Sequence, residues 1–189
     1  QLNGLPEDAL AAARQAAEAD GKEGYKLTLQ MPSYLPVMQY CDSRDLREQM
    51  YRAYVTRASE FGPEERDNSP LIDKILSLRA EEAALLGYPN YAAVSLATKM
   101  AESPAQVLQF LREMGSKSKP FALRDWQELC EFARSQLAIE QLQAWDVAYA
   151  SEKLRQARYA FSDNDVKQYF PEPVVLDGLF KLLETLFQL

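Results

Sequence analysis

Two pairs of carboxylates in this sequence have the residue type, though not the geometry, for binding a metal ion. Glu81 and Glu82 are adjacent in an expected helix, where neighbouring side chains point to different faces and cannot converge on one ion. Asp163 and Asp165 follow Ser162 at an expected helix start. A serine hydroxyl and first-turn carboxylates satisfy the free N–H groups there. We therefore interpret both pairs as solvated or capping groups.

Aromatic residues near the C-terminus offer a second kind of chemistry. Phenol hydroxyls can donate hydrogen bonds to the carbonyl groups of a bound peptide, and the aromatic residues that could line such a channel are Trp145, Tyr149, Tyr159, Phe161 and Tyr169. The alternative is that these are core aromatics with a polar tip at the edge. We favour the core interpretation.

The residues next to the lysine and cysteine side chains in the sequence do not indicate a catalytic nucleophile. Lys153 stands next to Glu152, which predicts a surface ion pair rather than a Schiff-base lysine. Cys41 and Cys130 are the only cysteines, and two isolated cysteines form neither a metal-binding spacing nor a disulfide framework. Reduced thiols in a cytoplasmic protein fit this pattern best.

The sequence contains no histidine. A zinc site of the H-E-x-x-H kind needs two imidazoles one helical turn apart. A Ser-His or Cys-His pair needs one as a base, and a ferritin-like di-iron site uses Glu-x-x-His. These chemistries are excluded within the chain, which leaves only carboxylate-based or lysine-based catalysis open. We predict no catalytic residue, metal site or cofactor in these residues.

Composition points to an ordinary globular protein. Hydrophobic residues make up 47% and charged residues 26% of the 189 residues. The net charge of −7 and the absence of a basic run argue against binding of nucleic acid. No apolar run approaches the roughly 20 residues that span a bilayer, so no membrane partner is expected. The first residue is Gln1 rather than methionine, which favours a chain cut from a longer protein.

Hydrophobic periodicity predicts a mainly α fold over residues 1–189, organised as one helical segment. A break or kink is expected between Gly115 and Pro120, and an irregular link over 133–143. The predicted helices cover Leu5–Asp20, Ser33–Cys41, Ser43–Phe61, Ser69–Gly87, Tyr88–Thr98, Ser103–Met114, Phe121–Gln136, most of Leu142–Phe161, a short turn after Ser162, and a last helix containing Val175–Phe187.

The apolar stripes predict which helix faces are buried. In the third helix, Arg44, Arg47, Glu48 and Arg52 form the expected wet face. The fourth helix carries a stripe of Ile72, Ile75, Leu76, Ala80 and Ala83. The last helix has a stripe wide enough to lie buried against neighbours, formed by Val175, Leu176, Leu179, Phe180, Leu183, Leu186 and Phe187.

One short segment has the period of a strand. Apolar and polar residues alternate from Tyr25 to Gln30 before Pro32 ends the pattern. Because a single strand is not stable alone, its partner must lie elsewhere, in another short run here or in the rest of a longer protein.

Several segments resemble the thimet oligopeptidase family of zinc endopeptidases. They are W-D-x-A-Y-x-x-E-K from Trp145 to Lys153, Y-F-P at 169–171, L-x-G-L-F at 176–180, K-L-T-L-x-x-P-S-Y-x-P-V-M at 26–38, R-D-L-R-E-x-x-Y at 44–51, and the run from Asn68 to Tyr88. The resemblance implies a subdomain of a zincin-like oligopeptidase that lies upstream of the zinc-binding helix.

The resemblance also implies what the parent protein does. It predicts cytoplasmic cleavage of short peptides in a narrow channel, with zinc bound elsewhere in the parent and this chain forming part of the channel wall. Its partner would be the rest of the peptidase. Tyr149 is the substrate-binding candidate, since the resemblance is densest around it, although Ala150 stands where the family often has a second tyrosine.

A helical scaffold that binds a protein or peptide without turnover is the alternative function. The acidic surface suits it, but capped helices of unequal length without a repeat argue against a solenoid. Self-association through the apolar last helix is a further expectation.

Overall fold

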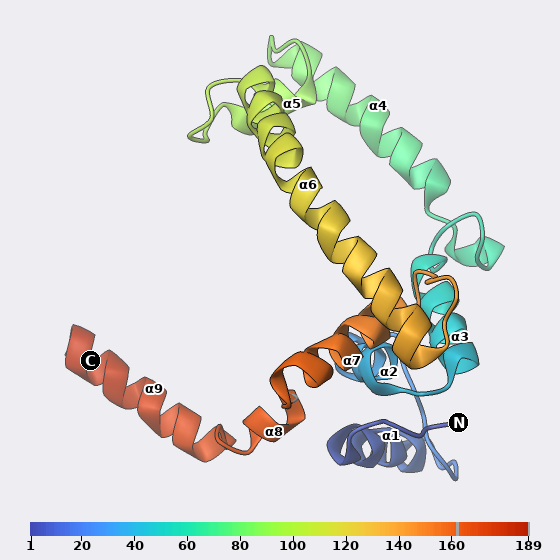
Figure 1. Cartoon of the computed structure of the whole chain (residues 1–189). Helices are drawn as coiled ribbons and strands as arrows, with labels where there is room; N and C mark the ends of the chain where they lie inside the picture. The colour runs from blue at the N-terminus through green and yellow to red at the C-terminus, as the bar shows by residue number, and fades with distance from the viewer. Residues whose placement is uncertain (162, 189) are drawn as a thin grey trace. The chain divides into compact units, whose positions relative to one another are not determined.

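The computed structural model describes residues 1–161 and 163–188, and it is mostly helical (Figure 1). The prediction of a mainly α fold is confirmed. The chain forms two compact units. We call residues 1–50 together with the described part of 132–189 the first unit, and residues 51–131 the second unit.

The helices of the first unit are α1 (Glu7–Ala19), α2 (Met31–Tyr40), α7 (Val147–Tyr159), α8 (Asp163–Lys167), α9 (Glu172–Phe187) and the start of α3 (Arg44–Val55). The second unit holds the 3-10 turn η1 (Glu64–Arg66), α4 (Ser69–Leu85), α5 (Tyr91–Leu96) and most of α6 (Pro104–Leu137). Ser162, the expected cap of α8, lies outside the described residues.

The core of the first unit is built around α2, which contacts both α1 and α7. Its buried side chains include Ala13 and Ala17 from α1, Tyr34, Val37 and Met38 from α2, and Ala150 from α7. The alanines bring the helix backbones close together, because a methyl group leaves little between them. This packing fixes α7 against the chain that connects α2 to α3.

The strand predicted from Tyr25 to Gln30 is wrong for the part of the chain that the structure describes. The Lys26 N–H donates to the Ala13 carbonyl of α1 at 2.9 Å, and the Thr28 N–H donates to the Ser33 hydroxyl at 2.9 Å. A strand needs a second extended backbone beside it. No described segment supplies one, so the alternating pattern forms no ladder.

Of the break or kink predicted between Gly115 and Pro120, the break is wrong, because α6 is continuous from Pro104 to Leu137. A proline within a helix removes its own N–H donor. In a helix of 34 residues, the loss of one backbone hydrogen bond is small compared with the hydrogen bonds of the remaining turns. The Ser118 hydroxyl donates to the Gly115 carbonyl at 3.3 Å within the same stretch.

The stripes of α4 and α9 are not buried by the described residues. In α4, Ile72 is 55% and Leu76 58% exposed, and only Ala83 is buried. In α9, Leu179 is 47% and Phe180 64% exposed. The predicted burial is therefore wrong within this chain, and both helices present apolar side chains for which the described residues offer no cover.

Helix starts follow local chemistry. A capping box forms at the start of α6: the Ser103 hydroxyl accepts from the Gln106 N–H, while the Gln106 side chain accepts from the Glu102 N–H. Ser69 is the first residue of α4. The Asp67 carboxylate accepts from both the N–H and the hydroxyl of Ser69.

Candidate functional site

A cluster of charged side chains in the first unit joins the start of α3 to the start of α7. We call it the Asp146 cluster, and its members are Asp42, Arg44, Arg47, Asp146, Tyr149 and Lys153. Asp146 precedes the first residue of α7, and its side chain is fully buried. The Arg47 side chain is only 1% exposed. A buried ion pair is stable only when its remaining hydrogen bonds are satisfied.

The Asp146 carboxylate accepts four well-formed donors. Arg44 binds the carboxylate in a bidentate manner: its Nε lies 3.0 Å from Oδ1, and its Nη2 lies 2.7 Å from Oδ2. Nη2 of Arg47 lies 3.0 Å from Oδ1. The backbone N–H of Gln143 donates to Oδ2 at 3.0 Å. The carboxylate thus ties two arginines and the turn before α7 together.

Arg47 uses its other donors on backbone carbonyls. Nη1 donates to the Cys41 carbonyl at 2.6 Å, and Nε to the Trp145 carbonyl at 3.2 Å. The prediction that Arg47 lies on the wet face of its helix is wrong. Its partner Asp146 is 99 residues away in the sequence, beyond the reach of helical periodicity.

Tyr149 lies on the same cluster. Its hydroxyl donates to Asp42 Oδ1 at 3.0 Å. The guanidinium of Arg47 lies 4.0 Å from the ring centroid and the Lys153 ammonium 5.2 Å, so two cations contact the ring. Lys153 also lies 3.8 Å from Asp42 Oδ1. The tyrosine, half-buried, is held by packing and by a carboxylate.

The predicted pairing of Lys153 with Glu152 is wrong. Adjacent helical residues face different directions, and Glu152 is buried at 4% exposure. Its carboxylate accepts from Arg155 at 2.6 Å and from Gln156 at 2.8 Å. Lys153 instead faces Asp42.

The other aromatic candidates lie at the surface. Tyr159 is 61% exposed, Phe161 45% and Tyr169 75%, so the core interpretation is wrong for them among the described residues. The rings of Tyr159 and Phe161 lie 6.3 Å apart. Trp145 is half-buried beside the Asp146 cluster, since its carbonyl accepts from Arg47.

Three members of the cluster, Asp146, Arg44 and Tyr149, have shifted pKa values that keep their charge states fixed around neutral pH. Burial alone would raise the pKa of Asp146, but hydrogen bonds from Arg44, the Gln143 N–H and Arg47 lower that pKa below its ordinary value. The bond to Asp146 raises the pKa of Arg44. Burial and the bond to Asp42 raise the pKa of Tyr149 to about 12. These groups are poor proton donors or acceptors near pH 7, and the arrangement favours structural support over acid–base catalysis.

Acid should weaken the first unit through Asp146. Its folded pKa lies below the ordinary value of 3.8, so its stabilising contribution is complete above about pH 4 and is lost as the pH falls toward the folded pKa. We expect the free energy of unfolding of the wild type to fall with pH in this window. Urea titrations of wild type and Asp146→Asn between pH 7 and pH 2 test this. Equal pH slopes for the two proteins would contradict it.

Tyr149 should titrate at a higher pH than the ordinary tyrosine value of 10.0. A difference titration of wild type against Tyr149→Phe, followed by ultraviolet absorbance of the phenolate, isolates its signal. We expect a midpoint near pH 12, because burial and the bond to Asp42 both favour the neutral phenol. A midpoint at the ordinary value near 10 would show that the Asp42 contact does not form in solution.

The donor set does not fit zinc. The chain has no histidine, and the described residues hold no group of three histidine, cysteine, aspartate or glutamate side chains that could share a metal ion. Glu81 contacts the Ser77 hydroxyl, and the side chain of Asp163 lies outside the described set.

Burial raises the pKa of Cys41, whose Sγ lies 3.3 Å from the Gln1 carbonyl oxygen.

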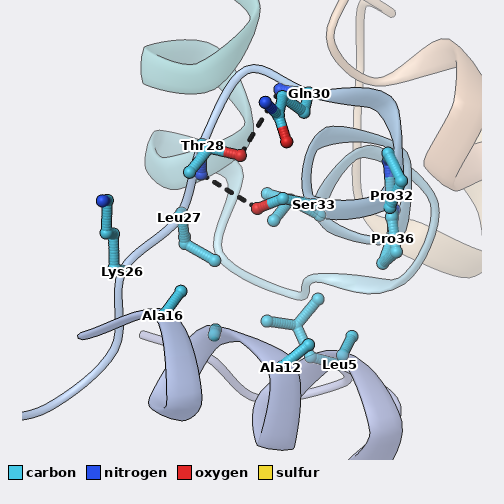
Figure 2. A pocket seen from close by; sticks show the side chains of 13 residues that line it. Leu5, Ala12, Ala16, Lys26, Leu27, Thr28, Gln30, Pro32, Ser33 and Pro36 are labelled. Atoms are coloured by element: carbon cyan, nitrogen blue, oxygen red, sulfur yellow. Dashed lines mark hydrogen bonds between the residues drawn. The ribbon is translucent and has the colours of Figure 1, made fainter. Parts of the chain in front are cut away.

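A small apolar cavity of about 200 Å³ lies between α1, the segment before α2, and α2 itself (Figure 2). Leu5, Ala12, Ala16, Leu27 and Pro36 are among its walls. Its hydroxyl groups are already engaged, as the dashed lines in Figure 2 show: Ser33 accepts from the Thr28 N–H, and Thr28 from the Gln30 N–H. The cavity is a packing space without a polar group directed at a ligand.

Within residues 1–161 and 163–188, no helix combines the length and apolar character needed to cross a membrane.

The sequence was compared with protein families and curated proteins. Peptidase family M3 matches residues 37–189. Oligopeptidase A of Salmonella typhimurium is 51% identical over 99% of this chain, and oligopeptidase A of Escherichia coli is 50% identical over 99%. A dipeptidyl carboxypeptidase of Salmonella typhimurium is 30% identical over 98% of the chain.

This chain spans 28% of the length of each oligopeptidase A and 27% of the carboxypeptidase. The family match covers more than half of the chain, and the resemblance first found in separate motifs therefore extends across nearly all of it. The chain belongs to peptidase family M3 and is similar to oligopeptidase A.

Proposed function

We propose that this chain is a non-catalytic part of the channel wall in an oligopeptidase A-like zinc metalloendopeptidase that hydrolyses short peptides in the cytoplasm. The observation that carries this proposal is the 51% identity to an oligopeptidase A along 99% of the chain. Identity at this level along nearly the whole chain supports a shared fold and a shared place in the whole enzyme.

The exposed helices support a role within a larger body. Apolar side chains on α4 and α9 would be covered by the rest of the peptidase, because soluble proteins rarely leave such contiguous faces in water. Relatives are more than three times as long as this chain, since it spans 28% of them. The remainder of the peptidase is therefore the proposed partner, and the two units would act together as one segment of its catalytic region.

Zinc in the whole enzyme would be held by residues outside this chain, because the chain has no histidine and its described residues hold no group of side chains that could share a metal ion. The residues of this chain would instead hold a helix of the channel wall in place. The Asp146 cluster fixes the start of α7 against α3, and Tyr149 on α7 is the one candidate here for contact with a peptide. Its hydroxyl would have to share or exchange the bond to Asp42 for that contact.

The proposal is tested on the full-length protein that contains this chain. We expect hydrolysis of a fluorogenic short peptide, loss of that activity with a zinc chelator, and recovery with added zinc. A folded protein that contains the sequence of the cleaved peptide should resist cleavage, because a narrow channel excludes a folded protein. Binding of the peptide without any cleavage would contradict the proposal and favour a helical scaffold.

A further inference from the structure

Residues 1–5, which we call the N-terminal turn, lie against the segment that connects α2 to α3. The Leu5 N–H donates to the Leu2 carbonyl at 3.3 Å, which closes the turn, and the Leu5 side chain is buried. The Asp42 N–H donates to the Asn3 carbonyl at 2.9 Å. The turn therefore binds the backbone of the residue whose carboxylate holds Tyr149.

Gly4 lies in close contact with the same segment. Its φ of +87° is in the left-handed region, which residues with a Cβ rarely adopt. A methyl group at this position would overlap the Tyr40 carbonyl oxygen and lie 3.0 Å from Asp42 Oδ1. A backbone carbonyl cannot rotate aside as the end of a flexible side chain can. Any side chain at Gly4 would therefore push the N-terminal turn away from Asp42.

The position of the Asp42 carboxylate depends on the backbone of Asp42. The Asp42 side chain is 50% exposed, so packing alone does not fix it. Its backbone is held on one hand by the N-terminal turn and on the other by Arg47, whose Nη1 donates to the Asp42 carbonyl at 3.3 Å. The Tyr149 hydroxyl donates to Asp42 Oδ1 at 3.0 Å, the oxygen that a side chain at Gly4 would approach.

We propose that Gly4 is a positioning residue for Tyr149, because the close fit of the N-terminal turn fixes Asp42 and Asp42 fixes the tyrosine hydroxyl. This role rests on the proposed function, in which Tyr149 is the candidate for contact with a bound peptide. A hydroxyl that is already held in place loses less conformational freedom when a peptide binds, which favours binding.

Titration of Tyr149 in the 189-residue chain tests the positioning. The ultraviolet difference between each protein and its Tyr149→Phe counterpart isolates the phenolate signal. We expect a midpoint near pH 12 in the wild type and a midpoint about one unit lower in Gly4→Ala, because burial still raises the pKa while the bond to Asp42 is lost. A midpoint that stays near 12 in Gly4→Ala would overturn the inference.

Gly21→Ala is the matched control for backbone strain. The φ of Gly21 is also positive, at +69°, but an added methyl group there would meet no neighbouring atom within 4 Å. The Tyr149 midpoint should stay near 12 in this variant. An equal fall in both glycine variants would mean that strain, rather than the contact with Asp42, moves the tyrosine, and would also overturn the inference.

A shortened chain that begins at Leu5 covers the case in which Gly4→Ala does not fold. It lacks the Asn3 carbonyl that binds Asp42, but it keeps the buried Leu5 side chain and introduces no clash. Thermal unfolding at pH 7 shows which variants are folded. The Tyr149 midpoint of the folded shortened chain should also fall, and an unchanged midpoint would count against the role of the turn.

Cleavage of a fluorogenic short peptide by the full-length protein tests the consequence for binding. Gly4→Ala should raise KM about 2- to 10-fold with little change in kcat, because one hydrogen bond to the peptide is weakened equally in the ground state and the transition state. In a Tyr149→Phe background, Gly4→Ala should raise KM no further, since its effect acts through that hydroxyl.

The two measurements separate the possible failures. A KM that Gly4→Ala raises equally in both backgrounds would show a general structural effect and reject the positioning role. An unchanged KM beside a shifted midpoint would reject Tyr149 as a peptide contact. A wild type that does not cleave the peptide would reject the proposed function, and the Tyr149 midpoint would still decide whether Gly4 positions the tyrosine.

Discussion

Replacing Asp146 with alanine should lower the free energy of unfolding of the first unit by about 3–5 kcal/mol. The variant leaves Arg47, with a side chain only 1% exposed, buried without its counter-charge. It also removes the acceptor for the Gln143 N–H and for Arg44. Net stabilities of domains are about 5–15 kcal/mol, so this loss is a large share of the total.

Trp145 gives a local signal for this measurement. The chain has two tryptophans, and a Trp126→Phe background leaves only Trp145, which adjoins Asp146. Urea unfolding followed by its fluorescence compares the wild type with Asp146→Ala. Asp8→Ala is the matched control, since it removes an aspartate from an ion pair with Lys167 whose side chains are 59% and 61% exposed. An exposed pair contributes about 0–1 kcal/mol. Similar losses for the two variants would contradict the role given to the Asp146 cluster.

A charge on α9 should be harmless in this chain and damaging in the full-length protein. Leu179→Lys places an ammonium on a side chain that is 47% exposed here, and we expect a change within about 0.5 kcal/mol. If the rest of the peptidase covers α9, the same variant buries an unpaired charge there. Such burial costs at least several kcal/mol and should prevent stable folding or strongly lower the melting temperature.

The comparison is made by thermal unfolding of both proteins with and without the variant. Glu184→Gln on the same helix is the control, because Glu184 is exposed and polar and its neutralisation should change little in either protein. Equal small effects of Leu179→Lys in the two proteins would show that α9 stays uncovered in the full-length enzyme.

The positions of the helices could be predicted from the sequence, because the contacts that begin them join residues that are close together in the sequence. Ser103 and Gln106 cap α6 through contacts three or four residues apart, and Asn90 caps α5 by accepting from the Ala93 N–H. Such contacts depend on residue type and spacing alone. Apolar and polar residues do alternate from Tyr25 to Gln30. The described chain, however, contains no second extended segment with which these residues could form a β-sheet.

The Asp146 cluster could not be predicted in the same way. Periodicity placed Arg47 on a wet face because charged residues usually are exposed. Its burial depends on Asp146, 99 residues later, and on the Cys41 and Trp145 carbonyls. A signal was present in part, since Arg44, Arg47 and Asp146 all fall within the segments that resemble the peptidase family. Residue type alone did not reveal that the segments meet.

We propose that the hydrolytic chemistry of the whole protein lies outside these 189 residues. The most direct test incubates the purified chain with zinc, removes free metal, and then measures bound zinc and cleavage of a fluorogenic short peptide. We expect less than stoichiometric zinc and no cleavage above the rate without protein. One tightly bound zinc ion per chain, or peptide turnover that a chelator abolishes, would contradict it.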